Sequence, residues 1–276
     1  MLDPVRVSLS QPSPALNAPM APFQSHETVD ILGVPVAATN MRDSVERIKA
    51  WIHEKSRAYV CVSGVHGIME CQRSEKVRSV HNSANLIVPD GMPLVYISRV
   101  AGHKNTTRVY GPDLLLEMCK ESLAQEFTHF FFGTTPATLA SLHDRLIRHF
   151  PGLRIVGTYA PPFRPLTPDE TAAVISHINS RGPDIVWVGL STPKQECWMA
   201  ENRNDLNAPV LIGVGAAFDF HAGKVPQAPR WMQPLCLEWL FRLIAEPRRL
   251  WKRYLLNNPH FVWLVMLQAL KLKTYK

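Results

Sequence analysis

The residues best suited to chemistry stand where short apolar runs end. Asp90 closes the run NLIVPD and is followed by Gly91, whose missing side chain would let a substrate approach. A carboxylate in this place suits a general base that takes the proton from a hydroxyl nucleophile. The structural alternative is that Asp90 caps the helix that follows it. The spacing leaves both interpretations open.

Ser63 and His66 end the preceding apolar run, in the sequence VCVSGVHG. A serine and a histidine can act as nucleophile and base in acyl transfer, but no GxSxG elbow surrounds Ser63, which argues against that reaction. We expect both residues to face the crevice that contains Asp90. His66 is predicted to form a hydrogen bond with a substrate, and the alternative is a histidine that stabilises a turn.

Further polar and glycine residues follow two later apolar runs, within residues 184–219. Gly213 and Gly215 supply half of a dinucleotide fingerprint, but the third glycine is absent, so a nicotinamide site is weakly supported. Small residues there still let backbone amides approach a phosphate. Gln195 and Asp219 would lie at the carboxyl ends of strands, where open α/β sheets bind ligands. The alternative for Gln195 is a solvated helix residue.

The C-terminal tail, residues 230–276, is basic and rich in tryptophan. It holds nine Lys/Arg and two Glu, an excess of seven, which equals the net charge of the whole chain. It also holds four of the seven tryptophans. Cationic and apolar side chains interleaved in this way indicate an anionic membrane surface or a phosphate-rich ligand, rather than nucleic acid.

A helical projection of the tail separates these two kinds of side chain. Arg242, Arg249 and Arg253 fall on one side. The other side is apolar: Leu237, Leu240, Phe241, Ile244, Trp251 and Leu255. The arginine row is either a solvated face or a clamp for a diphosphate, which guanidinium groups bind in bidentate fashion. Pro247 must kink or split this helix, and a second apolar segment is expected after Pro259.

The elements that must position these residues alternate along the chain. We expect strands at 29–39 (two, turning at Gly33), 58–64, 85–90, 129–133, 153–160, 184–190 and 208–215. Helices are expected at 40–55, 65–84, 91–102, 112–126, 135–150, 170–182 and 194–204. This alternation predicts an α/β fold with a parallel sheet that is covered by helices on both faces.

Composition sets the remaining limits. Residues 1–28 contain five prolines and few charges, which predicts a disordered leader. No secretory signal and no run of about 18 apolar residues is seen, so we expect an intracellular protein without a spanning helix. The five cysteines form no CxxC pair, which favours reduced thiols over disulfides or zinc. No DxD pair occurs, which argues against a metal-chelating nucleotide-sugar site.

Five linked sequences make the chain resemble a known family. VPDG, RVYGPDLL, GLSTPKQECW, GVGAAFDFHAGKVPQAPRWM and LEWLFRLIAEPRRLWKRY resemble the WecG/TagA/CpsF glycosyltransferases over about residues 29–256. The resemblance implies a Rossmann-like catalytic core at 29–229 and a helical, membrane-associating appendage at 230–276. It also implies inverting transfer of a sugar from a UDP-sugar to a polyprenyl-pyrophosphate-linked sugar, in surface polysaccharide synthesis, without an essential metal or other cofactor.

The resemblance also assigns residues. Asp90 matches the base for the acceptor hydroxyl, and Gln195 matches a glutamine near the reacting sugars. Arg242 and Arg249 match arginines that close over the donor diphosphate, while Lys252 and Arg253 compete for the third cation. The enzyme would then be peripheral on the cytoplasmic side of the bacterial inner membrane.

Two departures from the family pattern leave the donor sugar open. Cys61-Val62-Ser63 replaces a common Thr-x-Asn sequence, and Met92-Pro93 replaces a glycine-containing one. N-acetylmannosamine-type and glucosyl donors are therefore both considered, as a hexose or N-acetylhexosamine in general. The other function classes are a soluble Rossmann-type oxidoreductase and a non-enzymatic peripheral membrane protein. The oligomeric state, a homo-oligomer included, is also left open.

Overall fold

The structure is a computed structural model that describes residues 27–275, apart from the side chain of Arg230. The predicted leader thus lies almost wholly outside the described residues. An antiparallel hairpin of β1 (Thr28–Ile31) and β2 (Val34–Ala37) opens the described chain and turns at Gly33, as predicted. The described parallel strands are β3 (Ala58–Ser63), β4 (Leu86–Pro89), β5 (Thr128–Gly133), β6 (Arg154–Tyr159), β7 (Ile185–Gly189) and β8 (Val210–Gly213).

These six strands form one parallel sheet in the order β4-β3-β8-β7-β5-β6. Their apolar runs are buried on both faces, because successive side chains point to opposite sides of a strand. In β3, for example, Val60 packs on one face of the sheet and Cys61 on the other. The predicted α/β fold with a Rossmann-like parallel sheet is confirmed.

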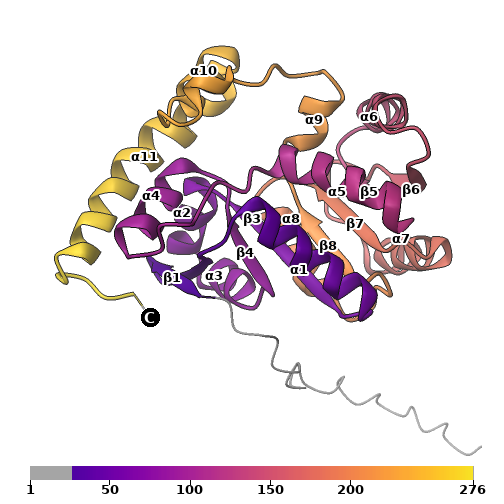
Figure 1. Ribbon diagram of the computed structural model, residues 1–276, viewed down its shortest axis with the longest axis horizontal. Coiled ribbons are helices and arrows are strands. Elements are labelled where there is room, and N and C mark those ends of the chain that lie inside the picture. The colour runs from indigo at the N-terminus through magenta and orange to yellow at the C-terminus, as the bar shows by residue number, and fades with distance from the viewer. Residues whose placement is uncertain (1–26, 276) are drawn as a thin grey trace, which may run out of the picture.

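Helices cover both faces of this sheet (Figure 1). The core on one face draws on α1 (Met41–His53), α5 (Gly111–Gln125), α6 (Pro136–His149) and α9 (Ala217–His221). The core on the other face draws on α2 (Val65–Arg73), α3 (Glu75–Asn82), α4 (Met92–Val100), α7 (Pro168–Arg181) and α8 (Lys194–Asn202). The sheet is therefore held between two helical layers, which leaves the ends of its strands as the place for a site.

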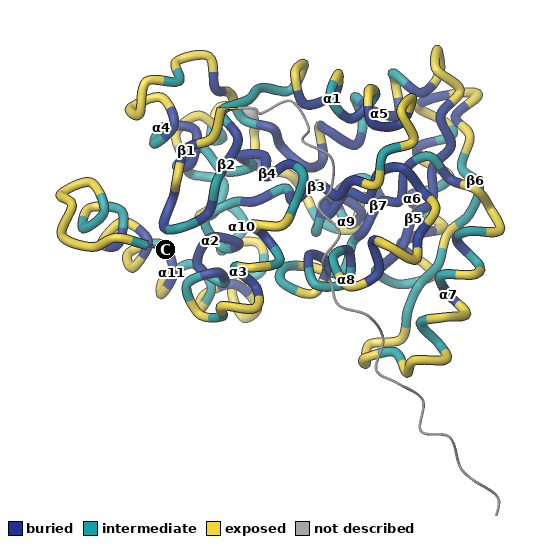
Figure 2. Tube along the Cα trace, turned by 90° about the horizontal axis from the view of Figure 1, so that it is seen from below, coloured by how far each residue is buried: buried dark blue, intermediate teal, exposed yellow. Residues whose placement is uncertain are grey.

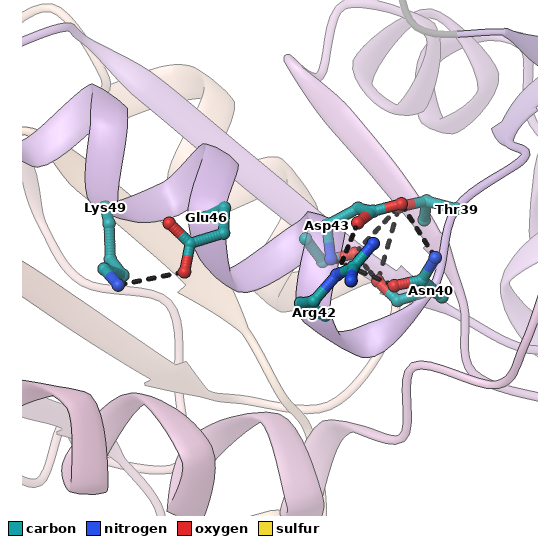
Figure 3. A network of polar contacts seen from close by, with 7 residues as sticks. Thr39, Asn40, Arg42, Asp43, Glu46 and Lys49 are labelled. Atoms are coloured by element: carbon teal, nitrogen blue, oxygen red, sulfur yellow. Dashed lines mark hydrogen bonds and ion pairs between the residues drawn. The ribbon is translucent and has the colours of Figure 1, made fainter.

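Local side-chain caps fix where the helices begin, as α1 illustrates (Figure 3). Asn40 Oδ1 accepts a hydrogen bond from the backbone amide of Asp43 at 3.0 Å, and Asn40 Nδ2 donates to Asp43 Oδ2 at 2.7 Å. One turn further, Lys49 Nζ lies 2.9 Å from Glu46 Oε1. The cap satisfies an amide that has no partner in the first turn, and so sets the start of the apolar stripe that faces the sheet.

The single helix predicted at 65–84 is wrong, because the chain forms α2 and α3 there. Ser74 separates them with an extended backbone (φ −141°, ψ 118°). Its hydroxyl oxygen accepts a hydrogen bond from Val77 N at 3.4 Å, so it caps α3. Serine favours caps over helix interiors for this reason.

The tail forms α10 (Glu238–Ala245) and α11 (Pro247–Ala269). Pro247 stands at the first turn of α11, so the helix is split there, one of the two outcomes predicted. Pro259 does not begin a new segment, because α11 continues through it. Proline removes one backbone hydrogen bond from a helix, which destabilises it. The helix is held here because Asn257 and Phe261, on either side of Pro259, are buried against the core.

Helix α11 is fastened to the core along its length. It packs beside α2 (Figure 1), and Phe261 and Leu264 enter the core on that face of the sheet. Near its end, Gln268 Oε1 accepts a hydrogen bond from Leu32 N, in the hairpin of β1 and β2, at 3.0 Å. Figure 2 shows much of α11 in the colour of exposed residues, unlike the buried strands. None of the helices within residues 27–275 has the length and hydropathy that crossing a bilayer requires.

Candidate active site

A cavity of about 320 Å³ opens at the carboxyl ends of β3 and β4, beneath α10 and α11. We call it the Asp90 cavity. Its polar walls include His66, Asp90, Arg108, Glu238, Arg242, Arg253 and Asn257, and its apolar walls include Trp239, Tyr254 and Phe261. Its size falls within the range of small-molecule sites, roughly 300–1,000 Å³. The C-terminal tail therefore supplies about half of the wall of this cavity.

Asp90 follows β4 and lies half-buried at the base of the cavity. Its Oδ1 accepts a hydrogen bond from the backbone amide of Gly111, the first residue of α5, at 3.0 Å. The alternative reading as a cap for the next helix is therefore wrong, since α4 has Gly91 at its N-cap without a side-chain bond. Burial raises the pKa of the Asp90 carboxyl, although Arg108 opposes the change, which suits a proton acceptor.

Arg108 packs behind Asp90 and was not singled out from the sequence. Its Nε donates to the backbone oxygen of Asp90, and its Nη2 lies 2.7 Å from Glu238 Oε2. The guanidinium carbon lies 3.8 Å from the centre of the Tyr110 ring, a cation–π contact. Arg108 thus connects the end of β4 to the beginning of α10.

His66 lines the same cavity from the first turn of α2. Its Nδ1 lies 3.3 Å from Asn257 Nδ2 on α11. Burial, and next the charge of Arg253, lower the pKa of His66 to about 3, so the ring is neutral at physiological pH. A neutral imidazole can exchange a hydrogen bond with a substrate without adding charge.

Arg242 on α10 and Arg253 on α11 both line the cavity. Neither forms an ion pair with a carboxylate in the part of the chain that the structure describes, and the Nε atoms of both are buried without a hydrogen-bond partner there. Burial lowers the pKa of Arg253, and so do the positive charges of Arg242 and Arg249. Gathered cations that form no ion pair favour binding of an anion.

Ser63, Gln195 and Gly215 lie beside the cavity rather than in its wall. Ser63 is buried, and its carbonyl accepts a hydrogen bond from Asp90 N at 2.9 Å. Gln195 is also buried, and its Oε1 accepts a hydrogen bond from Gly215 N at 3.0 Å. The backbone of Gly215 has a φ of +55°, which favours glycine. In this arrangement Gln195 ties the loops after β7 and β8 together.

Asp219 and Arg249 are not in the wall of the Asp90 cavity, and they interact electrostatically with each other. Asp219 lies on α9, where burial raises the pKa of its carboxyl and the charge of Arg249 and a hydrogen bond with Thr134 oppose that change. Arg249 is exposed, and its guanidinium is bound to Glu246 by a hydrogen bond of 2.8 Å from Nε to Oε1. Arg249 carries the same charge as Arg253, but its guanidinium is already bound to Glu246.

Sequence reasoning missed much of the cavity wall, including the polar residues Arg108, Glu238 and Asn257. Arg108 and Glu238 lie in two of the family-like sequences, RVYGPDLL and LEWLFR, and opposite charges there could have suggested a pair. Nothing in the sequence indicated that Asn257, 191 residues after His66, would contact it. Among residues 27–275 no three His, Cys, Asp or Glu side chains gather as they would around a metal ion.

A second hollow, of about 490 Å³, lies between α5, α6 and α9. Arginines and histidines line it, among them Arg145 and His221. It contains none of the residues predicted for a site, so the Asp90 cavity is the better candidate.

Comparison with known proteins identifies related sequences. The model of the glycosyl transferase WecG/TagA/CpsF family matches residues 29–275. A Bacillus subtilis (strain 168) protein is 28% identical over 250 residues, covering 90% of this chain and 95% of the relative. A Bacillus spizizenii protein is 28% identical over 216 residues (78% and 81%), and a Staphylococcus aureus (strain NCTC 8325 / PS 47) protein is 27% identical over 252 residues (90% and 96%). All three relatives are named N-acetylglucosaminyldiphosphoundecaprenol N-acetyl-beta-D-mannosaminyltransferase.

Proposed function

We propose that this chain, which belongs to the WecG/TagA/CpsF family of glycosyl transferases, moves a sugar from a UDP-sugar to a polyprenyl-pyrophosphate-linked sugar. The chain is thus a glycosyltransferase, and the proposal concerns its substrates and its residues. One observation carries it: the cavity that holds the half-buried Asp90 is also walled by Arg242 and Arg253, which have no ion-pair partner among the described residues.

Asp90 is the proposed base for the acceptor hydroxyl. As the acceptor oxygen bonds to the anomeric carbon of the donor sugar, the hydroxyl proton passes to Asp90, and the bond from that carbon to the diphosphate breaks. This single displacement inverts the anomeric configuration. The pKa of Asp90, raised by burial, increases its affinity for the proton that it must take.

The arginines are proposed to stabilise the diphosphate that leaves. Arg242 and Arg253 line the cavity, whereas Lys252 is exposed with its Nζ 5.4 Å from the centre of the Trp251 ring. This difference supports Arg253 over Lys252 as the cation beside Arg242. Arg249, the remaining proposed cation, lies outside the cavity wall and would have to release Glu246 to reach the diphosphate. Bound guanidinium groups supply positive charge where negative charge develops, which a transferase that uses no metal requires.

The names of the relatives suggest the substrates. Proteins named as transferases of N-acetylmannosamine to a diphosphoundecaprenol-linked N-acetylglucosamine support a lipid diphosphate acceptor for this chain. The donor is proposed as a hexose or N-acetylhexosamine of UDP, because Cys61-Val62-Ser63 and Met92-Pro93 are near Asp90 and differ from the common pattern. Surface polysaccharide synthesis is the setting that such substrates imply.

The tail is proposed to hold the enzyme on the cytoplasmic face of the bacterial inner membrane. Of the sixteen large apolar side chains that are exposed within the described residues, twelve belong to residues 231–272. Trp251 and Trp263 are about half exposed, and Lys271 and Lys273 are exposed at the end of α11. Apolar side chains flanked by cations favour an anionic bilayer surface.

The fraction of the protein that sediments with anionic vesicles should be lower in the double variant Trp251→Ser/Trp263→Ser than in the wild type.

The observations weigh against an oxidoreductase. In the half fingerprint of Gly213 and Gly215, the amide of Gly215 already donates to Gln195 and is not free for a pyrophosphate. Family membership excludes the non-enzymatic alternative.

A panel of UDP-sugars, incubated with a polyprenyl-pyrophosphoryl sugar, tests the proposal. Acceptor-dependent UDP release from one donor is the expected result, and lipid-independent hydrolysis alone would refute the transfer.

A further inference from the structure

The pair formed by Arg108 and Glu238 is placed differently from the other ion pairs of the described chain. Their side chains are only 13% and 16% exposed, and their charged atoms lie 2.7 Å apart in the wall of the Asp90 cavity. Arg108 is further fixed by the Tyr110 ring and by its hydrogen bond to the backbone oxygen of Asp90. Glu238 belongs to the tail, since it is the first residue of α10.

We propose that Glu238 is a positioning residue that holds the Arg108 guanidinium on the backbone oxygen of Asp90 and away from its carboxylate. The proposal rests on the proposed function, in which Asp90 is the base. If so, Asp90 can act as a base only while α10 covers the cavity. Glu238, on α10, is the one carboxylate in the described structure that forms an ion pair with Arg108.

The physical reason is competition between two carboxylates for one guanidinium. A planar guanidinium binds a carboxylate strongly and in bidentate fashion. If Glu238 were absent, Arg108 would be left beside Asp90 as its nearest anion, and a salt bridge would occupy the oxygens that must receive the proton. Shielding from solvent strengthens both interactions, since charges attract more strongly at low dielectric constant.

The electrostatics agree with this geometry. Burial raises the pKa of Asp90 most; the charge of Arg108 then lowers it, the charge of Glu238 raises it, and the charge of Arg242 lowers it. The charge of Asp90 in turn raises the pKa of Arg253, on α11, while burial keeps His66 neutral in the same cavity. Removing the charge of Glu238 therefore leaves Asp90 facing cations only, and its pKa should fall.

The decisive experiment measures transfer as a function of pH for the full chain. Glu238→Gln should lower kcat roughly 10-fold or more at pH 7, because part of the contribution of a general base, about 10²–10⁴-fold, is lost. Its acid limb should move to lower pH, with the KM for the donor nearly unchanged. The double variant Arg108→Gln/Glu238→Gln should move the acid limb back up and recover part of the activity, since the competing cation is gone. Glu201→Gln is the matched control, because it removes an exposed carboxylate of α8 that pairs with Lys76 of α3, away from the cavity.

A merely structural role for Glu238 gives a different result. In that case Glu238→Gln would reduce activity and stability with an unmoved acid limb, and the double variant would be worse than the single one. Either finding overturns the proposal. Carbon-13 NMR titration of the Asp90 carboxyl, assigned with Asp90→Asn, gives a readout that needs no turnover. A pKa that is lower in Glu238→Gln than in the wild type supports the proposal even if the substrates are wrong, whereas an unchanged pKa refutes it.

Discussion

Lys252 and Arg253 are neighbours in the sequence, and their surroundings differ. The Arg253 side chain crosses into the Asp90 cavity and has a buried Nε without a partner in the described chain, while Lys252 is exposed. A cation matters for binding a diphosphate only where it can reach the phosphate oxygens without competition from water. The helix position of each residue, rather than its charge, decides which of them can serve.

Substitution of each cation tests this difference. Arg253→Gln should reduce kcat/KM for the UDP-sugar by about 10²-fold, the order expected when one charged hydrogen-bonding group of a transition-state clamp is removed. Lys252→Gln should stay within about twofold of wild type. Steady-state kinetics at saturating acceptor measure both. Equal losses of kcat/KM in the two variants would contradict the assignment of Arg253 as the cation that binds the diphosphate.

At this scale the sequence predicted which residues matter better than what each one contacts. Asp90, His66, Arg242 and Arg253 were all predicted, and the structure brings them to one cavity. The bonds of Gln195 with Gly215 could not be predicted, because they depend on how two loops from different strands approach each other. The partners of a polar side chain are set by tertiary packing, which local patterns do not contain.

At the scale of elements, α11 is held by a few buried side chains on an otherwise exposed helix. Phe261 is 3% exposed and packs in the core beneath α2, whereas Val262, its neighbour, is 56% exposed. The hydrogen bonds of Asn257 and Gln268 hold the helix on either side of Phe261. Helix α11 is therefore a part of the fold that also completes the site.

Removal of these side chains should have unequal effects. Phe261→Ala should destabilise the chain by about 3–5 kcal/mol, because it removes a buried aromatic ring and leaves a cavity. Val262→Ala, the matched control, should change the stability by less than about 0.5 kcal/mol. Urea denaturation followed by circular dichroism measures both. A small effect of Phe261→Ala would mean that α11 is not docked in solution as it is here.

The order and type of the elements were predictable, and several boundaries were not. Runs such as IVWVG are apolar throughout, which predicts strands that are buried on both faces, and β7 is such a strand. The amphipathic pattern continues across Ser74 and therefore predicts a helix interior there, although Ser74 caps α3. Pro259 predicts a boundary, but burial of Asn257 and Phe261 against the core overrides the preference of the proline.

At the scale of the whole molecule, buried histidines that stay neutral in the folded chain make the stability depend on pH. His129 is fully buried, and burial lowers its pKa to about 3, as it does for His66. Burial also lowers the pKa of His221. In the unfolded chain these histidines take up protons below about pH 6.5, while the folded chain does not. The unfolded state therefore gains protons first as the pH falls, and stability is lost from about pH 6.5 downward.

This dependence is measurable. Each histidine that titrates only in the unfolded state should contribute a slope of about 1.4 kcal/mol per pH unit to the free energy of unfolding. Urea denaturation between pH 7.5 and pH 5 should show the loss, and His129→Gln should reduce its slope. His260→Asn, at an exposed position of α11, should leave the slope unchanged. A stability that is constant over this range would contradict the buried, neutral state of these rings.

The measurement that tests the central claim most directly is acceptor-dependent UDP release by the wild type and by Asp90→Asn. The amide of asparagine keeps the shape of Asp90 but cannot take a proton, so release should fall about 10²–10⁴-fold while the fold and donor binding are retained. Asp169→Asn, on the exposed first turn of α7, should match the wild type. Release that Asp90→Asn leaves unchanged would place the base, and the reaction, outside the Asp90 cavity.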